Sequence, residues 1–270
     1  YKEYMFMIYL NCIKYRKEVF KMRAALIGYG TMGRLVYEEL GSECAVVIAP
    51  NGPDCMNNLF EYEKPIDIII DFSVPANLNM ICEYAINHKT PVVIATTGFN
   101  PEQKKQIKEL SKIVPVLKST NFSIGSILMN KFIKEVTPLL CDDFDIEVVE
   151  KNQSRKDNRS YYMTESIVDL IEEETALNPK YDRESNASRS GNEIGVSLIK
   201  GGNMQPTHEV LYCGENEILT ISHTELSANQ FAKGAYDAAL WLLTKSTGLY
   251  SMEEYLSLIH ISEPTRRSYI

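Results

Sequence analysis

The sequence predicts an α/β protein: a doubly wound, Rossmann-type parallel sheet, followed by a second, α+β domain on a mostly antiparallel sheet. Short, continuously apolar segments alternate with helical segments over residues 22–118, which is typical of parallel strands buried on both faces. Beyond residue 190, three strand-like segments follow one another without intervening helices, which is typical of antiparallel pairing. The 270 residues are enough for two domains, each with its own core.

The elements of the parallel domain follow from its apolar runs. The first run, residues 23–27, leads into a glycine-rich turn, and residues 34–40 then show a helical pattern. The run at 66–71 is almost wholly β-branched, as expected of a buried strand. Further strands are predicted at 45–49, 91–95 and 114–117, and further helices at 77–87 and 101–112.

A different order of elements is predicted for the second half. Residues 126–140 form an amphipathic helical stretch, and a strand at 145–149 precedes a basic, polar loop at 151–159. The remaining predictions are a helix at 164–174, a polar connection at 178–192, strands at 194–200, 208–212 and 218–223, and an apolar helix at 230–244 carrying the only tryptophan, Trp241.

Both ends of the chain match no element that this fold requires. Residues 1–21 precede a natural start at Met22, and the segment from 257 to 270 has no hydrophobic periodicity. We therefore expect residues 1–21 and 257–270 to be non-native extensions.

The composition argues against several classes of partner. Lys and Arg total 28 against 36 Asp and Glu, so the net charge of −8 argues against nucleic acid. No apolar run approaches the roughly 20 residues of a membrane span. The six cysteines are scattered without a C-x-x-C pair, which indicates reduced thiols of a cytoplasmic protein. No His, Cys or Asp cluster has metal-ligand spacing, so we expect no metal site.

A glycine pattern lies directly between the first predicted strand and helix. Gly28 permits the tight turn, Gly30 lets the backbone approach a pyrophosphate, and Gly33 allows the helix and strand to pack closely. The amide groups of the helix N-terminus and its partial positive charge then favour phosphate. This pattern predicts a dinucleotide site.

The choice of dinucleotide is less well defined. The second strand ends Ile48-Ala49-Pro50-Asn51, without the acidic residue that usually binds the ribose 2′-hydroxyl of NAD. No arginine stands there for the 2′-phosphate of NADP, although Arg34 could approach a phosphate. The missing acid favours NADPH, and both NADPH and NADH stay open.

Three further loops follow predicted strands, at the edge where open sheets bind ligands. They are Asp71-Phe72-Ser73, Thr96-Thr97-Gly98-Phe99 and Asn121-Phe122-Ser123-Ile124-Gly125, each with small residues, hydroxyl groups and backbone amides. Together they predict a nicotinamide cleft. The candidate cofactor-binding residues are Gly28, Gly30, Thr31, Met32, Gly33, Phe72, Ser73, Thr96, Thr97, Gly98, Asn121, Phe122 and Ser123.

In order and spacing, these motifs resemble the 4-hydroxy-tetrahydrodipicolinate reductase (dihydrodipicolinate reductase) family. The motifs are Gly28-x-Gly30-x-Met32-Gly33, Asp71-Phe72-Ser73-x-Pro75, Ala95-Thr96-Thr97-Gly98 and Asn121-x-Ser123-x-Gly125, and the segments 195–202, 208–210, 221–223 and 231–241 agree. The resemblance runs from Met22 to about Leu256.

This resemblance implies hydride transfer from NADPH or NADH to a cyclic dicarboxylate on the route to diaminopimelate and lysine. It also implies a cytoplasmic homotetramer assembled through the sheet of the second domain. Its domain plan is a dinucleotide-binding domain at 22–125, a substrate-binding and oligomerisation domain at 126–228, and a C-terminal helix at 229–256 that returns to the first domain.

The substrate loop departs from the family pattern. Lys156 falls on the family's catalytic lysine, but Asn152 stands where the proton-donating histidine is expected, and an amide cannot act as a general acid. The candidate catalytic residues are thus Lys156 and Asn152. Ser160 matches a carboxylate-binding serine, and Tyr161 and Tyr162 replace glycine and threonine, so Lys156, Ser160 and the tyrosines are the candidate substrate-binding residues.

Two alternatives stay open because of this departure. One is a related amino-acid dehydrogenase whose altered loop accepts a different substrate. The other is a cofactor-binding homologue with a degenerate substrate site, which binds the dinucleotide without turnover.

Overall fold

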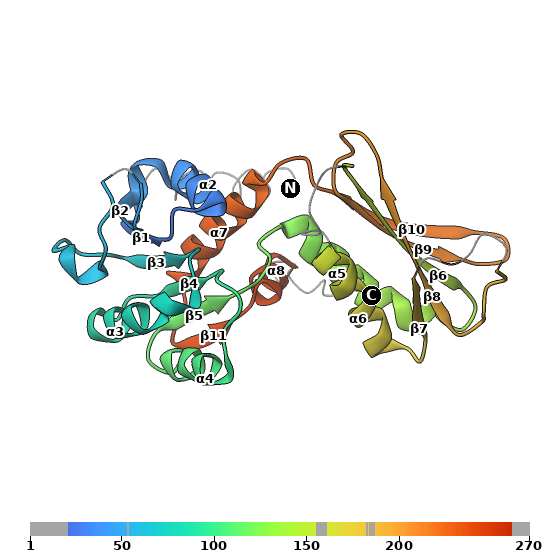
Figure 1. Cartoon of the computed structure of the whole chain (residues 1–270). Helices are drawn as coiled ribbons and strands as arrows, with labels where there is room; N and C mark the ends of the chain where they lie inside the picture. Colours follow the sequence, from blue (N-terminus) through green and yellow to red (C-terminus); the bar gives the residue numbers. More distant parts are fainter. Residues whose placement is uncertain (1–20, 53, 155–160, 182, 184–186, 261–270) are drawn as a thin grey trace, which may run out of the picture. The chain divides into compact units, whose positions relative to one another are not determined.

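The computed structural model describes residues 21–52, 54–154, 161–181, 183 and 187–260. The chain forms two compact units (Figure 1). The first combines the residues up to Phe122 with those from Asn229 onward, and the second is the continuous segment Ser123–Ala228.

The first unit is built on a six-stranded sheet in the order β11-β5-β4-β3-β1-β2. Every pairing in it is parallel, which confirms the predicted doubly wound sheet. All four side chains of β1 and of β3 are buried, as continuously apolar runs require. The strands are β1 (Ala24–Ile27), β2 (Cys44–Ile48), β3 (Ile68–Asp71), β4 (Val92–Ile94), β5 (Pro115–Lys118) and β11 (Gly248–Tyr250).

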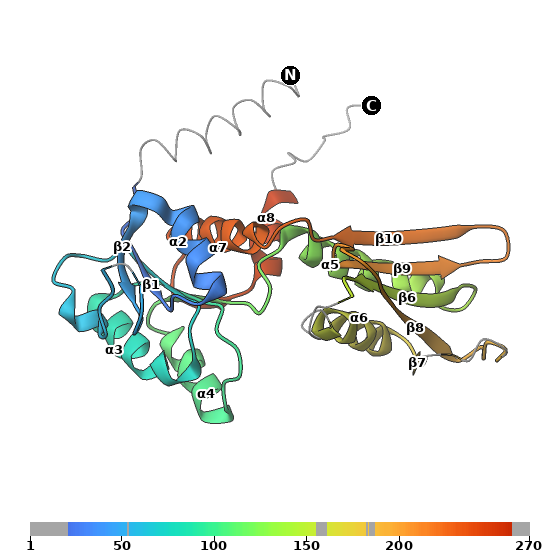
Figure 2. The ribbon, with the colours of Figure 1, turned by 45° about the horizontal axis from the view of Figure 1, so that its top comes forward.

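Helices cover both faces of this sheet. Helix α2 (Thr31–Leu40) packs beside α7 (Asn229–Leu242) on one face, and α3 (Leu78–His88) packs beside α4 (Pro101–Leu110) on the other (Figure 2). Helix α4 begins where the sequence signals a start, because Asn100 and Gln103 form a capping box around Pro101. Short 3₁₀ turns lie at Gly41–Glu43, Leu59–Glu61 and Pro75–Asn77.

The last segment of the chain is more complex than predicted. Helix α7 matches the expected helix at 230–244 and contacts α2, β3, β4 and β5. The expectation of one C-terminal helix for 229–256 is wrong, because β11 follows α7, pairs in parallel with β5, and is followed by α8 (Met252–His260). The sheet therefore has a sixth strand that the sequence analysis missed.

The second unit contains a five-stranded sheet in the order β10-β9-β6-β8-β7. Its α+β class is as predicted, but the sheet is mixed: β6 pairs with β8 and β7 with β8 in parallel, and the other two pairings are antiparallel. Strand β7 lies inside the expected polar connection 178–192. The strands are β6 (Asp145–Asn152), β7 (Asn178–Tyr181), β8 (Glu193–Lys200), β9 (Thr207–Cys213) and β10 (Ile218–Thr224).

Two helices, α5 (Ile124–Leu140) and α6 (Tyr161–Glu174), cover one face of this sheet. Strand β6 alternates between buried and half-buried residues, so one set of its side chains enters the core that α5 and α6 close. The opposite set faces away from the helices, and no helix among the described residues covers it. We call this uncovered surface the open sheet face; its apolar side chains are Val149, Ile199, Leu211 and Ile218.

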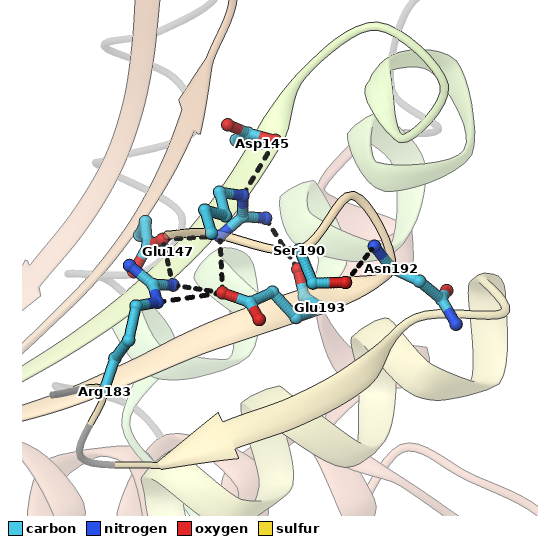
Figure 3. Close-up of polar contacts among 7 residues, drawn as sticks. Asp145, Glu147, Arg183, Ser190, Asn192 and Glu193 are labelled. Atoms are coloured by element: carbon cyan, nitrogen blue, oxygen red, sulfur yellow. Dashed lines mark hydrogen bonds and ion pairs between the residues drawn. The ribbon is translucent and has the colours of Figure 1, made fainter. Parts of the chain in front are cut away.

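An ionic cluster lies at one end of the open sheet face (Figure 3). Arg183 and Arg189 both donate to the Glu147 carboxylate, at 2.8 Å and 2.5 Å, and Arg183 also donates to Glu193 at 2.8 Å. Glu147 pairs in register with Gly195, where a Cβ atom would overlap its carboxylate. The missing side chain at Gly195 therefore lets Glu147 lie across β8 and reach both guanidinium groups.

Candidate functional site: the glycine turn and the strand-end loops

The turn after β1 requires glycine at its first position for two reasons. Gly28 has φ +94°, a conformation that residues with a Cβ atom rarely adopt. A Cβ atom there would also overlap the Phe72 carbonyl oxygen at the end of β3. The Gly28 amide donates to the Ile48 carbonyl at 2.8 Å, which ties the turn to β2. The turn thus lies directly against the ends of both neighbouring strands.

Gly33 and Gly30 differ in what surrounds them. A Cβ atom at Gly33 would overlap the Gly28 carbonyl oxygen, so helix α2 packs directly on the turn. Gly30 has an ordinary φ of −76°, and a Cβ atom there would meet nothing within 4 Å. Gly30 is the N-cap of α2, with no side-chain cap and no acidic residue in the first turn. The space beside Gly30 is therefore open, and a pyrophosphate needs such access to the amides of a helix N-terminus.

The loops after β3 and β4 are joined by buried hydrogen bonds. The Asp71 carboxylate, 1% exposed, accepts from the Ser73 hydroxyl at 2.5 Å and from the Ser73 amide at 3.1 Å. The Ser73 amide also donates to the Thr96 hydroxyl at 2.9 Å, and Thr96 hydrogen-bonds Asp71. Burial raises the pKa of Asp71 to about 6 despite these donors. This small network fixes two strand ends against each other.

The loop after β5 completes the edge. The Phe122 ring lies 5.8 Å from the Phe72 ring, and the Ser119 hydroxyl donates to the Asn121 carbonyl at 2.5 Å. Gly234 of α7 lies against this loop, because a Cβ atom there would overlap the Phe122 carbonyl oxygen. Gly98, in the exposed loop after β4, has φ +80°.

The structure thus places twelve of the thirteen predicted cofactor residues, Gly28 to Phe122, after strands β1, β3, β4 and β5 of the first unit. Thr31 and Met32 form the first turn of α2, where Thr31 is exposed. Ser123 is the first residue of the second unit, where its hydroxyl caps α5 by accepting from the Ser126 amide at 3.4 Å.

A cation lies beside the turn at the β2 end of the sheet. The Arg34 guanidinium carbon lies 5.5 Å from the centre of the Tyr29 ring, and Arg34 is exposed on α2. Gly52, in the loop that follows β2, lies close to the same ring. Arg34 is therefore held near the position where a dinucleotide's second ribose is expected.

In the second unit, Asn152 closes β6 and is 1% exposed. Its side-chain oxygen accepts from the Gln153 amide at 2.9 Å, and its side-chain nitrogen donates to Glu150 at 3.4 Å. Glu150 is also buried and accepts from the Thr164 hydroxyl of α6 at 2.5 Å. The Asn152 amide is therefore turned into the core between β6 and α6.

The other candidate substrate and catalytic residues follow β6 in the sequence. Lys156 and Ser160 lie outside the described residues, and Tyr161 and Tyr162 are the first residues of α6.

Two histidines occupy the predicted strands of the second unit. His208 of β9 is 1% exposed, and it pairs in register with Glu150 of β6 and His223 of β10. Burial lowers the pKa of His223, whose Nδ1 lies 3.4 Å from the Ser126 hydroxyl oxygen. No group of three His, Cys, Asp or Glu residues within the described ranges is arranged to hold a metal ion.

Two further findings concern the described part of the chain. A cavity of about 340 Å³ lies at Phe60, Tyr84 and His88, near the C-terminus of α3 and away from the strand ends described above. None of the described helices is long and apolar enough to cross a membrane.

Comparison with known proteins places the chain in a family. The family model described as "Dihydrodipicolinate reductase, N-terminus" matches residues 22–122, and the model "Dihydrodipicolinate reductase, C-terminus" matches residues 125–256. The chain belongs to the dihydrodipicolinate reductase family. This confirms the family inferred from the glycine turn and the three loops, and with it an NAD(P)H-dependent oxidoreductase of diaminopimelate and lysine biosynthesis.

Individual members of the dihydrodipicolinate reductase family agree along most of their length. The 4-hydroxy-tetrahydrodipicolinate reductase of Rickettsia bellii is 37% identical over 240 residues, which cover 87% of this chain and 95% of that protein. The enzyme of the same name from Exiguobacterium sibiricum is 38% identical over 238 residues, covering 86% and 95%.

A solved structure shows the fold of the dihydrodipicolinate reductase family. Dipicolinate-bound dihydrodipicolinate reductase from Paenisporosarcina sp. TG-14 superposes with a TM-score of 0.69 at 17% sequence identity, covering 88% of this chain and all of that one. A myo-inositol dehydrogenase from Corynebacterium glutamicum reaches a TM-score of 0.50 at 13% identity.

Proposed function

We propose that the chain reduces 4-hydroxy-tetrahydrodipicolinate to tetrahydrodipicolinate with NADPH or NADH. The observation that carries this proposal is the joining of the glycine turn to the loop after β3: Gly28 lies against Phe72, and Asp71 binds Ser73 and Thr96. These contacts form one continuous edge of glycines, hydroxyl groups and amides, in a chain of the matching family.

The glycine turn fits a dinucleotide. Gly30 leaves open space before the amides of α2, while Gly28 and Gly33 pack the turn closely. We assign the pyrophosphate to Gly28 through Gly33, and the nicotinamide end to Phe72, Ser73, the 96–98 loop and the 121–123 loop. The bound cofactor supplies a hydride. The residues assigned here bind and orient the cofactor and exclude water from one of its sides.

The residues near the end of β2 determine the choice between NADPH and NADH. Arg34 stacks on Tyr29 there, and no acidic residue ends β2. A cation at this place, together with the lack of an acidic residue at the end of β2, favours the 2′-phosphate of NADPH. Paired titrations with NADPH and NADH on the wild type and Arg34→Ala test this preference.

The substrate side is assigned to the loop after β6. Lys156 is the catalytic group: it supplies positive charge to the dianionic substrate and the proton that, together with the hydride from the cofactor and loss of the 4-hydroxyl group as water, gives tetrahydrodipicolinate. Asn152 occupies the family's proton-donor position but is not a general acid, and its amide is engaged with Glu150 and Gln153.

Ser160, Tyr161 and Tyr162 are assigned to the substrate carboxylates. Dipicolinate, which is bound to the Paenisporosarcina relative, is a planar dicarboxylate of the expected class. Lys151, Arg155 and Arg159 add positive charge to this stretch of the sequence, which suits such a substrate.

We also propose a homotetramer assembled through the open sheet face, and a cytoplasmic location. Ile199 and Ile218 are 43% and 63% exposed on that face, which is a large apolar exposure for a strand. Burying this face against other copies of the chain removes it from water. The cytoplasmic location follows from the scattered cysteines and the biosynthetic family.

The test is cofactor oxidation by the full-length protein with freshly generated 4-hydroxy-tetrahydrodipicolinate and either NADPH or NADH. We expect turnover that is lost in Lys156→Ala and retained in Lys134→Ala, whose partner is Glu174. Cofactor binding without turnover of this substrate would contradict the proposal. Oxidation of a diamino acid in its place would support the alternative of a related dehydrogenase.

A further inference from the structure

Asp71 is a buried carboxylate within the cofactor edge, and no role for it followed from the sequence. It ends β3, is 1% exposed, and is hydrogen-bonded by Ser73 and Thr96. Removing a charge from water in this way destabilises a fold, so a buried carboxylate is expected where the charge has a function that a neutral group cannot serve. The directions of the hydrogen bonds around Asp71 indicate the function of this charge.

A carboxylate can only accept hydrogen bonds, so both hydroxyl groups must donate to Asp71. Ser73 Oγ lies 2.5 Å from Asp71 and 3.5 Å from the Val74 carbonyl oxygen, so the serine proton lies toward Asp71. Since a hydroxyl group has one proton, Ser73 Oγ has only lone pairs left for any other partner.

Ser73 is also placed to meet the cofactor. A Cβ atom on Gly28 would lie 3.0 Å from the Ser73 Cα atom, so the serine borders the glycine turn. Its side chain is half-buried, with one side toward solvent. A hydroxyl group that can only accept repels phosphate oxygens and suits ribose hydroxyl or carboxamide N–H groups.

We propose that Asp71 is a positioning residue that holds the Ser73 hydroxyl as a hydrogen-bond acceptor for a donor group of the nicotinamide cofactor. The donor is a ribose hydroxyl or the carboxamide N–H₂ group. This deepens the proposed function, since it rests on a cofactor at this edge. The Ser73 hydroxyl and the Ser73 amide both donate to the same oxygen, Asp71 Oδ1, so an asparagine at position 71 keeps an acceptor oxygen there and leaves the serine hydroxyl as an acceptor for the cofactor. A leucine at position 71 removes that oxygen, which frees the serine proton and reverses the polarity presented to the cofactor.

The experiment measures NADPH and NADH dissociation constants and thermal midpoints of the full-length protein without substrate. The variants are Asp71→Leu, Ser73→Ala and their double variant, and Asp71→Asn, which keeps the acceptor oxygen for Ser73, should bind the cofactor as the wild type does. Asp67→Asn is the matched control, because Asp67 precedes β3 and pairs with Arg23 at a partly exposed site. Asp71→Leu and Ser73→Ala are each expected to raise the dissociation constant about three- to tenfold, the effect of one hydrogen bond.

The double variant should bind no more weakly than either single one, because both changes remove the same acceptor. Asp71→Asn should not lower the thermal midpoint at neutral pH, because it removes a buried charge. A purely structural carboxylate gives the opposite result: a lowered midpoint in Asp71→Asn, and wild-type cofactor affinity in both Asp71→Leu and Ser73→Ala. That result would overturn the proposal.

The 3-acetylpyridine analogue of the cofactor, which has no carboxamide N–H, separates the two donors. If the carboxamide is the donor, the wild type binds the analogue more weakly than the natural cofactor and Ser73→Ala does not. If a ribose hydroxyl is the donor, the variant weakens both cofactors equally. Normal cofactor binding without turnover would contradict the proposed reductase and leave these comparisons intact.

Discussion

The Tyr236 hydroxyl of α7 donates a hydrogen bond of 2.7 Å to the Glu43 carboxylate, 193 positions earlier in the chain. The other oxygen of Glu43 accepts from the Met22 amide at 3.1 Å, just before β1. Burial and the Glu43 carboxylate both raise the pKa of Tyr236, so the phenol keeps its proton and remains a donor at ordinary pH. One carboxylate thus joins the two ends of the first unit.

We predict that Tyr236→Phe lowers the free energy of unfolding by about 1–2 kcal/mol, because it removes a hydrogen bond to a charged acceptor. Urea unfolding measures this loss. Tyr250→Phe is the control: its hydroxyl bonds the Ser246 carbonyl at an exposed site, so its loss should change little. Equal effects in the two variants would contradict the prediction.

We predict different effects on stability for alanine substitutions at Gly30 and Gly28 of the turn. Gly30→Ala should leave the free energy of unfolding within about 0.5 kcal/mol of the wild type and raise the cofactor dissociation constant at least about tenfold. Its methyl group would occupy the open space before the amides of α2 and meet no protein atom within 4 Å.

Gly28→Ala is the comparison, since its methyl group would overlap the Phe72 carbonyl at φ +94°. It should weaken cofactor binding and also destabilise the fold by about 1 kcal/mol or more. Thermal denaturation and cofactor titration measure the two effects. Loss of stability in Gly30→Ala would show that its surroundings are not open.

The raised pKa of Asp71 predicts a pH-dependent stability difference. In the folded state this pKa is about 6, against 3.8 for an ordinary aspartate, so folding takes up a proton between these two pH values. The carboxylate therefore lowers stability most above about pH 6, and this effect disappears as the pH falls toward about 4. Relative to the wild type, Asp71→Asn should gain about 1 kcal/mol between about pH 5 and about pH 7.

Urea unfolding of both proteins across this range measures the difference. Asp67→Asn should not show the same trend, because Arg23 lowers the pKa of Asp67. A flat difference for Asp71→Asn would mean that its carboxyl titrates normally in the fold.

The open sheet face predicts a variant with altered assembly. Ile218→Lys places a charge at an apolar residue that is 63% exposed on that face, and should shift the protein to smaller species in sedimentation velocity. Leu139→Lys is matched in chemistry, since Leu139 is 80% exposed but lies on α5. Equal behaviour of the two variants would argue against assembly through the sheet.

The parallel sheet was predictable because its strands are short apolar runs buried on both faces. The two missed strands lack this signal. Strand β11 is only Gly248-Leu249-Tyr250, and β7 reads Asn178-Pro179-Lys180-Tyr181, an edge strand with polar residues and a proline. Consecutive strands without intervening helices predicted a mostly antiparallel sheet. Because β7 and β8 pair in parallel, this prediction overestimated the proportion of antiparallel pairs.

The candidate site was predictable to the extent that turn chemistry marks it. Glycines and hydroxyl groups after apolar runs located the edge, but Asp71 resembled an ordinary turn residue until its hydrogen bonds to Ser73 and Thr96 were seen. The inward direction of the Asn152 amide depends on Glu150, which is two residues away on the same buried face. The spacing of two residues in a strand predicts that their side chains lie on the same face, but it does not predict that they contact each other.

Because the second unit is inserted between Phe122 and Asn229, the two units are completed in a fixed order during synthesis on the ribosome. When β5 has been made, its outer edge has no partner until β11 is synthesised about 130 residues later, which takes on the order of 10–30 s at typical elongation rates. During that interval Ser123–Ala228 emerges as one continuous piece, whereas the nascent Rossmann sheet presents an unpaired strand and lacks α7. Synthesis therefore leaves the nucleotide-binding unit as the last to close.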